Sequence, residues 1–188
     1  MEIEAWDERY RLGRTADLEG AANPLVVETC SKMPRGRALD LACGAGRNAL
    51  WLAENGWEVT AVDGAPTAVE TLRHRASQRR VRVEARVANL ISAAFEIGES
   101  SWDLILMCFY LQKSLFEPAK AGVRPDGAVL AIVHIAEVSE QPTGHQLRSG
   151  ELLASFADFE ILHYYEGEPR DSEHKRRVAE IVARRPQK

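Results

Sequence analysis

The stretch Leu39–Asn48 constrains the fold of this chain more than any other part of the sequence. It reads Leu-Asp-Leu-Ala-Cys-Gly-Ala-Gly-Arg-Asn, which is typical of an apolar strand, a two-glycine turn and the start of a helix. A second apolar run, Glu58–Val62, follows and ends at Asp63. Because parallel strands present their carboxyl ends at one edge of a sheet, we expect Asp40 and Asp63 to flank the glycine turn.

The rest of the chain alternates between expected helices and strands, which predicts an α/β fold. Strands are expected at 37–42, 58–62, 81–87, 102–108, 128–135, 159–165 and 176–183. Helices are expected at 3–12, 24–33, 47–54, 66–78, 114–121 and 150–156, a turn at 124–127, and loops or short helices at 92–99 and 137–147. Right-handed crossovers between such elements give a doubly wound, Rossmann-like, mostly parallel sheet of seven strands. The two closely spaced final strands favour an antiparallel strand near the C-terminus.

Length and composition favour a single domain made of residues 1–188, since no repeat, low-complexity tract or linker interrupts the pattern. The formal net charge of −4 argues against binding to a phosphate backbone as the main function. The cysteines Cys30, Cys43 and Cys108 show no Cys-x-x-Cys spacing, so we expect neither a disulfide framework nor a structural metal. With no expected signal peptide or membrane span, the chain is expected to be cytoplasmic.

The glycine turn has three interpretations. The first is a strand-to-helix turn that only needs glycine torsions. The second is a dinucleotide-binding fingerprint, and the third is a binding site for a sulfonium nucleoside. Gly44-x-Gly46-x-x-Ala49 matches the relaxed dinucleotide pattern, and Asp63 lies 17 residues after Gly46. Asp40 opposes that interpretation, because its carboxylate would repel a pyrophosphate.

S-adenosylmethionine suits the same residues better than a pyrophosphate does. Asp40 is placed to face the ammonium of its methionine part, and Asp63 to accept from both ribose hydroxyls. Asn89 and Leu90 follow the third expected strand, where a polar and an apolar side chain can meet the adenine. Cys108, at the end of the fourth expected strand, would close the floor of the site.

Two segments resemble motifs I and II of class I S-adenosylmethionine-dependent methyltransferases: Asp40-Leu-Ala-Cys-Gly-Ala-Gly46-Arg-Asn and Val59-Thr-Ala-Val-Asp63. Asn89 stands where that family often has Asp. Other segments resemble the branch of tellurite-resistance and thiopurine methyltransferases: 6–13, 47–48, 147–153 and 156–165. The resemblance implies an enzyme that uses S-adenosylmethionine and releases S-adenosylhomocysteine.

The resemblance also implies that the N-terminal segment closes over the cofactor, with Tyr10 and Arg14 at its carboxylate end. Trp6 and Tyr10 share one helix face, so packing of that face on the core is the plainer alternative. The whole expected cofactor site consists of Tyr10, Arg14, Asp40, Ala42, Gly44, Gly46, Asp63, Gly64, Asn89, Leu90 and Cys108.

The residues expected around the methyl acceptor lie at or beyond the ends of later strands. They are Tyr110, His134, His145 and Arg148, and a histidine among them would take a proton from the nucleophile. Each also has a structural alternative: Tyr110 as a cap of the pocket, His134 as a satisfied core residue, and His145 and Arg148 as parts of the long connection 136–149. The expected partner is a small molecule: a thiol, a chalcogen oxyanion or a heterocycle. A sensor that binds the cofactor without transferring methyl and a nicotinamide-dependent oxidoreductase stay open as alternatives.

A basic run, Arg73–Arg82, is the one segment that suggests nucleic-acid binding. Cations near the end of a helix complement its dipole and stay solvated, so we expect a structural role. Met107-Cys-Phe-Tyr110 follows the fourth strand in place of the tetrapeptide typical of enzymes that methylate a base amino group. No nucleic-acid or membrane partner is therefore expected.

Overall fold

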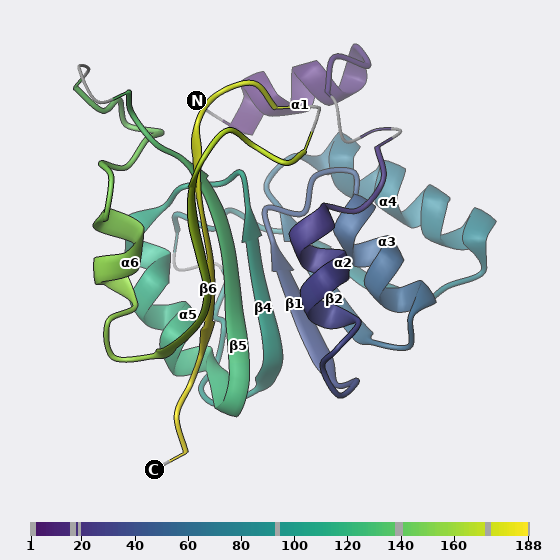
Figure 1. Ribbon diagram of the computed structural model, residues 1–188. Coiled ribbons are helices and arrows are strands. Elements are labelled where there is room, and N and C mark those ends of the chain that lie inside the picture. The colour runs from purple at the N-terminus through teal and green to yellow at the C-terminus, as the bar shows by residue number, and fades with distance from the viewer. Residues whose placement is uncertain are drawn as a thin grey trace. The chain divides into compact units, whose positions relative to one another are not determined.

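The computed structural model describes residues 3–15, 18, 20–92, 95–137, 141–171 and 174–187 (Figure 1). The expected loops at 92–99 and 137–147 thus lie partly outside the described residues. The strands follow the order β3-β2-β1-β4-β5-β7-β6 of a seven-stranded sheet. This order and the antiparallel C-terminal strands confirm the expected fold class. The chain divides into two compact units, Met1–Glu96 and Ile97–Lys188, which are described separately below.

The first unit alternates helices and strands around parallel strand pairs. Its elements are α1 (Ile3–Arg11), α2 (Pro24–Cys30), β1 (Arg37–Leu41), α3 (Arg47–Glu54), β2 (Glu58–Asp63), α4 (Pro66–Arg79) and β3 (Val83–Val87). Strand β2 pairs in parallel with both β1 and β3. Leu39 and Leu41 of β1, Leu50 and Leu52 of α3 and Leu72 of α4 are fully buried. Burial of these side chains holds the ends of β1 and β2 in place. Figure 1 shows α3 and α4 beside these strands.

Helix starts in this unit follow their sequence signals. The side chain of Asn23 accepts a hydrogen bond from the backbone N–H of Leu25 at 2.9 Å, and Pro24 occupies the first turn of α2. Pro66 opens α4 in the same way. Helix α2 ends at Cys30, three residues before the expected end at Met33, so helix ends are less well predicted than helix starts.

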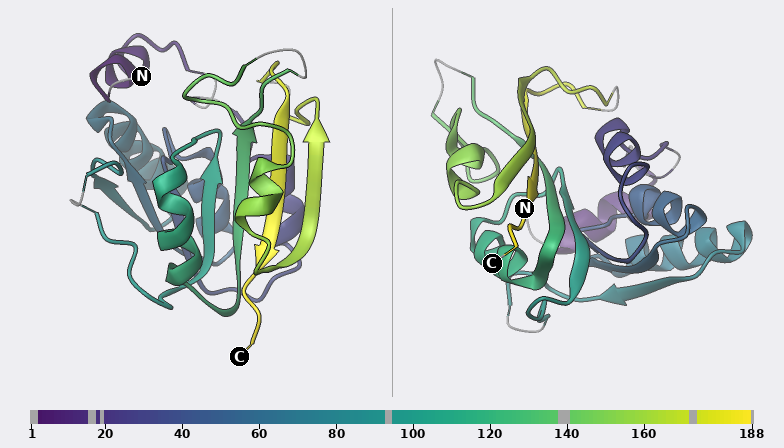
Figure 2. Two further views of the ribbon diagram at one scale, coloured as in Figure 1. Left: turned by 90° about the vertical axis from the view of Figure 1, so that its left-hand side faces the viewer. Right: turned by 60° about the horizontal axis from the view of Figure 1, so that its bottom comes forward.

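The second unit contains the antiparallel part of the sheet. Its elements are β4 (Trp102–Cys108), the 3₁₀ helix η2 (Lys113–Leu115), α5 (Phe116–Gly122), β5 (Val123–His134), α6 (Glu151–Ser155), β6 (Glu160–Gly167) and β7 (Val178–Arg184). Strands β4 and β5 are parallel, whereas β7 runs antiparallel to both β5 and β6. Figure 2 shows α5 and α6 on one side of these strands. Among the described residues, no helix is long and apolar enough to cross a membrane.

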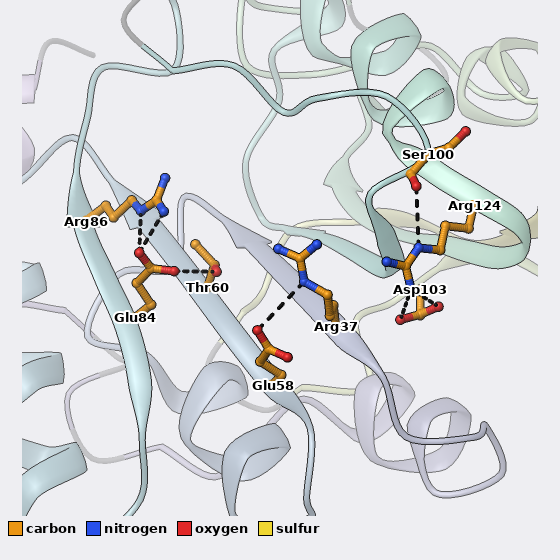
Figure 3. Close-up of polar contacts among 8 residues, drawn as sticks. All are labelled: Arg37, Glu58, Thr60, Glu84, Arg86, Ser100, Asp103 and Arg124. Atoms are coloured by element: carbon orange, nitrogen blue, oxygen red, sulfur yellow. Dashed lines mark hydrogen bonds and ion pairs between the residues drawn. The ribbon is translucent and has the colours of Figure 1, made fainter.

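Polar pairs join neighbouring strands in both units (Figure 3). In the first unit, Thr60 of β2 donates to Glu84 of β3 at 3.2 Å, and these residues are register partners. In the second unit, Arg124 of β5 donates to both carboxylate oxygens of Asp103 of β4 at 3.2 Å. Exposed ion pairs contribute at most about 1 kcal/mol each, so the buried apolar side chains are the main source of stability.

The expected turn at Arg124–Gly127 lies inside β5 and does not precede it. Asp126 has the positive φ of 64° that a turn residue adopts. Its backbone N–H nevertheless donates to the carbonyl of Arg185, whose own N–H donates to Gly127, both at 2.9 Å. Asp126 thus has the torsion of a turn residue, but its hydrogen bonds with the segment after β7 make the turn part of strand β5.

Candidate functional site

The turn after β1 has positive φ torsions, which glycine adopts most easily. Gly44 and Gly46 have φ values of 55° and 82°, and Ala42 has φ 56°. A Cβ on Gly46 would lie 2.9 Å from Cγ of the buried Leu72 and closer still to its Cδ1. Gly46 therefore combines a left-handed torsion with a tight approach to α4, and α3 begins directly after it.

Asp63, the last residue of β2, is bound to this turn. Its Oδ2 accepts a hydrogen bond from the backbone N–H of Gly44 at 2.9 Å, and its Oδ1 accepts one from the N–H of Ala65 at 2.8 Å. A carboxylate oxygen has two acceptor positions, so such an oxygen can accept from a backbone N–H and from a hydroxyl together. The partly exposed carboxylate thus fits the ribose diol of S-adenosylmethionine.

Asp40 lies on the neighbouring strand, in register with Ala61 of β2. Its side chain is 2% exposed. Two carboxylates at the ends of adjacent strands make this edge negative, and the N–H of Gly44 is already bound to one of them. That pattern opposes a pyrophosphate and favours a cationic ligand. The contact between Asp40 and an ammonium group stays a prediction.

Asn89 and Leu90 follow β3 at the same edge. The N–H of Ala88 donates to the backbone carbonyl of Asp63 at 2.9 Å, which brings this segment next to the end of β2. Leu90 is buried, while Asn89 is exposed and its Oδ1 accepts from the N–H of Ile91 at 2.9 Å. The amide of Asn89 is thereby held in a fixed local turn. Its expected role toward adenine stays a prediction.

Helix α1 packs on the segment that follows Asp63. A Cβ on Gly64 would lie 2.9 Å from Cδ1 of Ile3. Asp7 accepts a hydrogen bond from the backbone N–H of Thr67 at 2.7 Å and so caps α4 from another helix. These contacts place α1 across the start of α4 (Figure 1).

The aromatic face of α1 is not part of the core, contrary to the packing alternative. Trp6 is 39% exposed and its ring centroid lies 6.3 Å from that of Tyr10. The guanidinium carbon of Arg9 lies 4.7 Å from the Trp6 centroid. Tyr10 is partly buried and Arg14 is exposed. Their expected contact with the carboxylate end of the cofactor stays a prediction.

In the second unit, β4 ends in a sharp change of backbone direction. Cys108 closes the strand, and Phe109 has the positive φ of 59°, which is strained for an aromatic residue. The N–H of Phe109 donates to the carbonyl of Ile132 at 2.7 Å, which fixes this turn to β5. Cys108 and Tyr110 are both partly buried beside it.

An aromatic cluster of Phe109, His134 and His174 lies at the ends of β4 and β5. The rings of Phe109 and His174 are stacked, with centroids 3.4 Å apart and planes 5° apart. The His134 ring lies 5.7 Å from Phe109 and 5.6 Å from His174. The cluster thus brings the expected residue His134 together with two residues that the sequence analysis did not select.

His134 is held in its neutral form. Burial lowers its pKa, the positive charge of Arg176 lowers it further, and hydrogen bonds with the backbone of Arg177 and Arg176 act in the opposite direction. Its Nδ1 is buried and has no hydrogen-bond partner within the part of the chain that the structure describes. A neutral imidazole with the proton on Nε2 would carry a free lone pair at Nδ1.

The lowered pKa predicts how stability changes with pH. The unfolded chain binds a proton at His134 near the ordinary pKa of 6.5, whereas the folded chain resists it. The stability that the protein gains from keeping His134 neutral is therefore fully present above about pH 6.5. It is lost as the pH falls through the pKa of His134 in the folded chain. We expect the substitution His134→Phe to reduce the loss of unfolding free energy between about pH 7 and pH 5, measured by urea titration. Parallel pH profiles for the two proteins would contradict this.

His145 and Arg148 lie in the described segment 141–150 and are exposed. The side chain of Arg148 donates to Gln141 at 3.0 Å, and its backbone N–H donates to the carboxylate of Glu151 at 3.0 Å. These hydrogen bonds hold Arg148 to residues of its own segment and to the start of α6. Contact of either residue with a substrate stays a prediction.

The basic run of α4 makes intramolecular contacts. Arg73 donates to the carbonyl of Ala85 at 2.6 Å, and Arg75 donates to the carbonyl of Ala45 at 2.9 Å. Arg79 pairs with Glu54 at 3.2 Å. These contacts give the run a structural role, as expected for cations on a helix, and Arg75 supports the glycine turn directly.

Part of the chain matches the model of a known protein family. Residues 38–127 match the family model described as "Methyltransferase domain". "Hemagglutinin 1" of Eikenella corrodens is 30% identical over 138 residues, 69% of this chain and 46% of that protein. The chain thus spans about half the length of this curated relative.

Solved structures show the same fold. TehB from Haemophilus influenzae has a TM-score of 0.77 and 22% identity, over 95% of this chain and 67% of that chain. The 1,6-didemethyltoxoflavin-N1-methyltransferase of Burkholderia thailandensis, solved with 1,6-didemethyltoxoflavin and S-adenosylhomocysteine bound, has a TM-score of 0.72 and 20% identity. The latter likeness covers 98% of this chain and 87% of that chain.

Proposed function

Because this chain is a class I S-adenosylmethionine-dependent methyltransferase by its domain and its fold, we propose that it transfers a methyl group to a small-molecule nucleophile. The observation that carries the proposal is the position of Asp63. Its carboxylate ends β2, is partly exposed, and is held by the N–H groups of Gly44 and Ala65, and a carboxylate can accept from two neighbouring hydroxyls at once. That is the chemistry a ribose diol requires.

The family, the enzyme class and the cofactor expected from the motifs are confirmed by the domain match. The fold is confirmed by the likeness to TehB. The individual cofactor contacts, the acceptor and the reaction of the whole protein are our proposals, as are its cytoplasmic location and the lack of a nucleic-acid partner.

When bound, S-adenosylmethionine supplies a methyl group already activated on a sulfonium. The residues of this chain then have to bind the cofactor and the acceptor, orient the two molecules and exclude water. Asp63 holds the ribose, Gly44 and Gly46 let the backbone approach, and the negative edge at Asp40 attracts the cationic end. Alignment of a nucleophile with the methyl group lowers the activation barrier by up to about 7–11 kcal/mol.

We assign the acceptor side to the aromatic cluster. Neutral His134 lies in this cluster and is suited to take a proton from a thiol or ring nitrogen as the nucleophile attacks, because a neutral imidazole keeps a lone pair on one ring nitrogen. Phe109 and His174 provide flat faces on which a heterocycle can stack. Tyr110, His145 and Arg148 complete the proposed acceptor residues. The heterocycle named for the Burkholderia thailandensis enzyme supports this class of acceptor, alongside thiols and chalcogen oxyanions.

Cofactor selectivity is tested by thermal unfolding. We expect S-adenosylhomocysteine to raise the melting temperature and NADH to leave it unchanged, because Asp40 and the bound N–H of Gly44 oppose a pyrophosphate. At one hundred times its dissociation constant, a ligand adds about 2.7 kcal/mol to stability. Stabilisation by NADH alone would favour the oxidoreductase alternative.

Transfer itself is tested with labelled S-adenosylmethionine and a panel of thiols, oxyanions and heterocycles. We expect label in at least one acceptor and loss of that signal in His134→Phe, with S-adenosylhomocysteine binding retained. Binding without transfer to any acceptor would support the sensor alternative.

A further inference from the structure

A cavity of about 280 Å³ lies in the second unit, beside the segment that follows β5. It is lined by Ile135, Glu137, Thr143, Gln146, Arg176 and Arg177. Pockets for whole small ligands span about 300–1,000 Å³, so this volume suits one substituent of a ligand. None of these residues belongs to the cofactor and acceptor residues assigned above.

The charges of the cavity are unbalanced. Arg176 forms no ion pair with an acidic side chain in the described ranges 3–15, 18, 20–92, 95–137, 141–171 and 174–187. Arg177 is opposed by Glu137, but their closest N···O distance is 3.7 Å and their side chains are 24% and 53% exposed. Two guanidinium groups of the lining thus face one carboxylate of the lining, and Glu166, outside the lining, also acts on Arg177, in a chain whose net charge is −4.

The polar wall of the cavity is ordered by its own hydrogen bonds. Oε1 of Gln146 accepts from the N–H of Thr143 at 3.1 Å and from its hydroxyl at 2.9 Å. The N–H of Ile135 donates to the carbonyl of Arg177 at 3.0 Å. The amide oxygen of Gln146 is therefore used within the wall, whereas the carboxylate of Glu137 is only loosely held. The guanidinium groups supply the N–H donors for a ligand.

The cavity adjoins the aromatic cluster. Ile135 directly follows His134 in the chain, and the backbone of Arg176 and Arg177 hydrogen-bonds with the His134 ring. The charge of Arg176 acts on the same ring and contributes to its lowered pKa. A ligand on the cluster can thus extend one substituent to the two arginines.

We propose that this cavity binds an anionic group, a carboxylate or a phosphate, carried by the methyl acceptor. The proposal rests on the proposed function, since it names the charge of the acceptor. Guanidinium groups suit these anions because their planar N–H donors can pair with two oxygens at once. The acceptor would stack on Phe109 and His174 and be oriented by its anionic end.

Calorimetric titration of the full chain with inorganic phosphate and with acetate, in the presence of S-adenosylhomocysteine, tests the site. In the double variant Arg176→Gln with Arg177→Gln we expect affinity for the favoured anion to fall by at least about tenfold. We expect Glu137→Gln to tighten it, because that change removes the carboxylate that competes for Arg177. The anion that binds more tightly identifies the group.

Arg82→Gln is the matched control, since it removes one exposed positive charge far along the sequence from the cavity. Its anion affinity is expected to stay within about twofold of the native value. In the labelled-methyl screen, anionic acceptors should outperform their amide or ester counterparts in the native chain and lose that advantage in the double variant.

The proposal is overturned if the native chain binds neither anion, if the double variant binds as the native chain does, or if Glu137→Gln weakens binding. Failure of the methyltransferase proposal has a different signature. Thermal unfolding would then show no response to S-adenosylhomocysteine, whatever the anion titrations give. The two proposals are therefore tested separately.

Discussion

The substitution Gly46→Ala is expected to destabilise the protein by about 2–5 kcal/mol. A left-handed torsion costs a residue with a Cβ about 1–2 kcal/mol, and overpacking of a core adds about 1–3 kcal/mol. Both apply at Gly46, where φ is 82° and the new Cβ would meet the buried Leu72. Since domains are stable by only about 5–15 kcal/mol, urea unfolding should show a large shift of the midpoint.

Two other glycines separate these contributions. Gly150 has φ 78° but nothing within 4 Å of an added Cβ, so Gly150→Ala should cost only about 1–2 kcal/mol. Gly144 has open space and no positive φ, so Gly144→Ala should be nearly neutral. If Gly46→Ala cost no more than Gly150→Ala, the contact with Leu72 would not be tight in solution.

The substitution Asp63→Ala is expected to weaken binding of S-adenosylhomocysteine by about 1.5–3 kcal/mol, the range for hydrogen bonds to a charged group. This corresponds to an affinity loss of about tenfold to about 150-fold, measurable by calorimetry. The variant should also lose stability, because the N–H groups of Gly44 and Ala65 lose their acceptor. Asp63→Asn keeps one oxygen acceptor and is expected to fall between the native chain and Asp63→Ala.

Glu84→Ala is the control for charge, because it removes an exposed carboxylate from the neighbouring strand β3. Its affinity for S-adenosylhomocysteine should equal that of the native chain. Unchanged affinity in Asp63→Ala would remove Asp63 from the ribose site. The carboxylate would then serve only to tie the glycine turn to the end of β2.

The strands and helices were predictable where local chemistry and final packing agree. Strand β4 and helix α3 have the expected bounds, because an unbroken apolar run and the Asn55-Gly56 stop each leave one solution. Strand β5 differs, because pairing with Arg185, directly after the antiparallel β7, continues the strand through the proline-containing segment 124–127. Long-range pairing of this kind is not encoded in the segment itself.

The candidate site divides in the same way. The glycine turn and Asp63 are predictable, because their spacing within one strand-turn-helix-strand unit fixes where they meet. His174 was missed, because it lies in the connection between β6 and β7, and only the folded chain stacks it on Phe109. The signal for Phe109 was present, since it follows the buried strand β4 at the ligand edge, next to Tyr110.

The two amide bonds to Asp63 also bear on how a ligand is received. Each oxygen of the carboxylate is bound by a backbone N–H of a neighbouring turn, and these two bonds are part of the fold itself. The side chain therefore loses its conformational entropy when the chain folds, and not when the ligand binds. Recognition of the ribose then begins from a receptor group that needs no rearrangement.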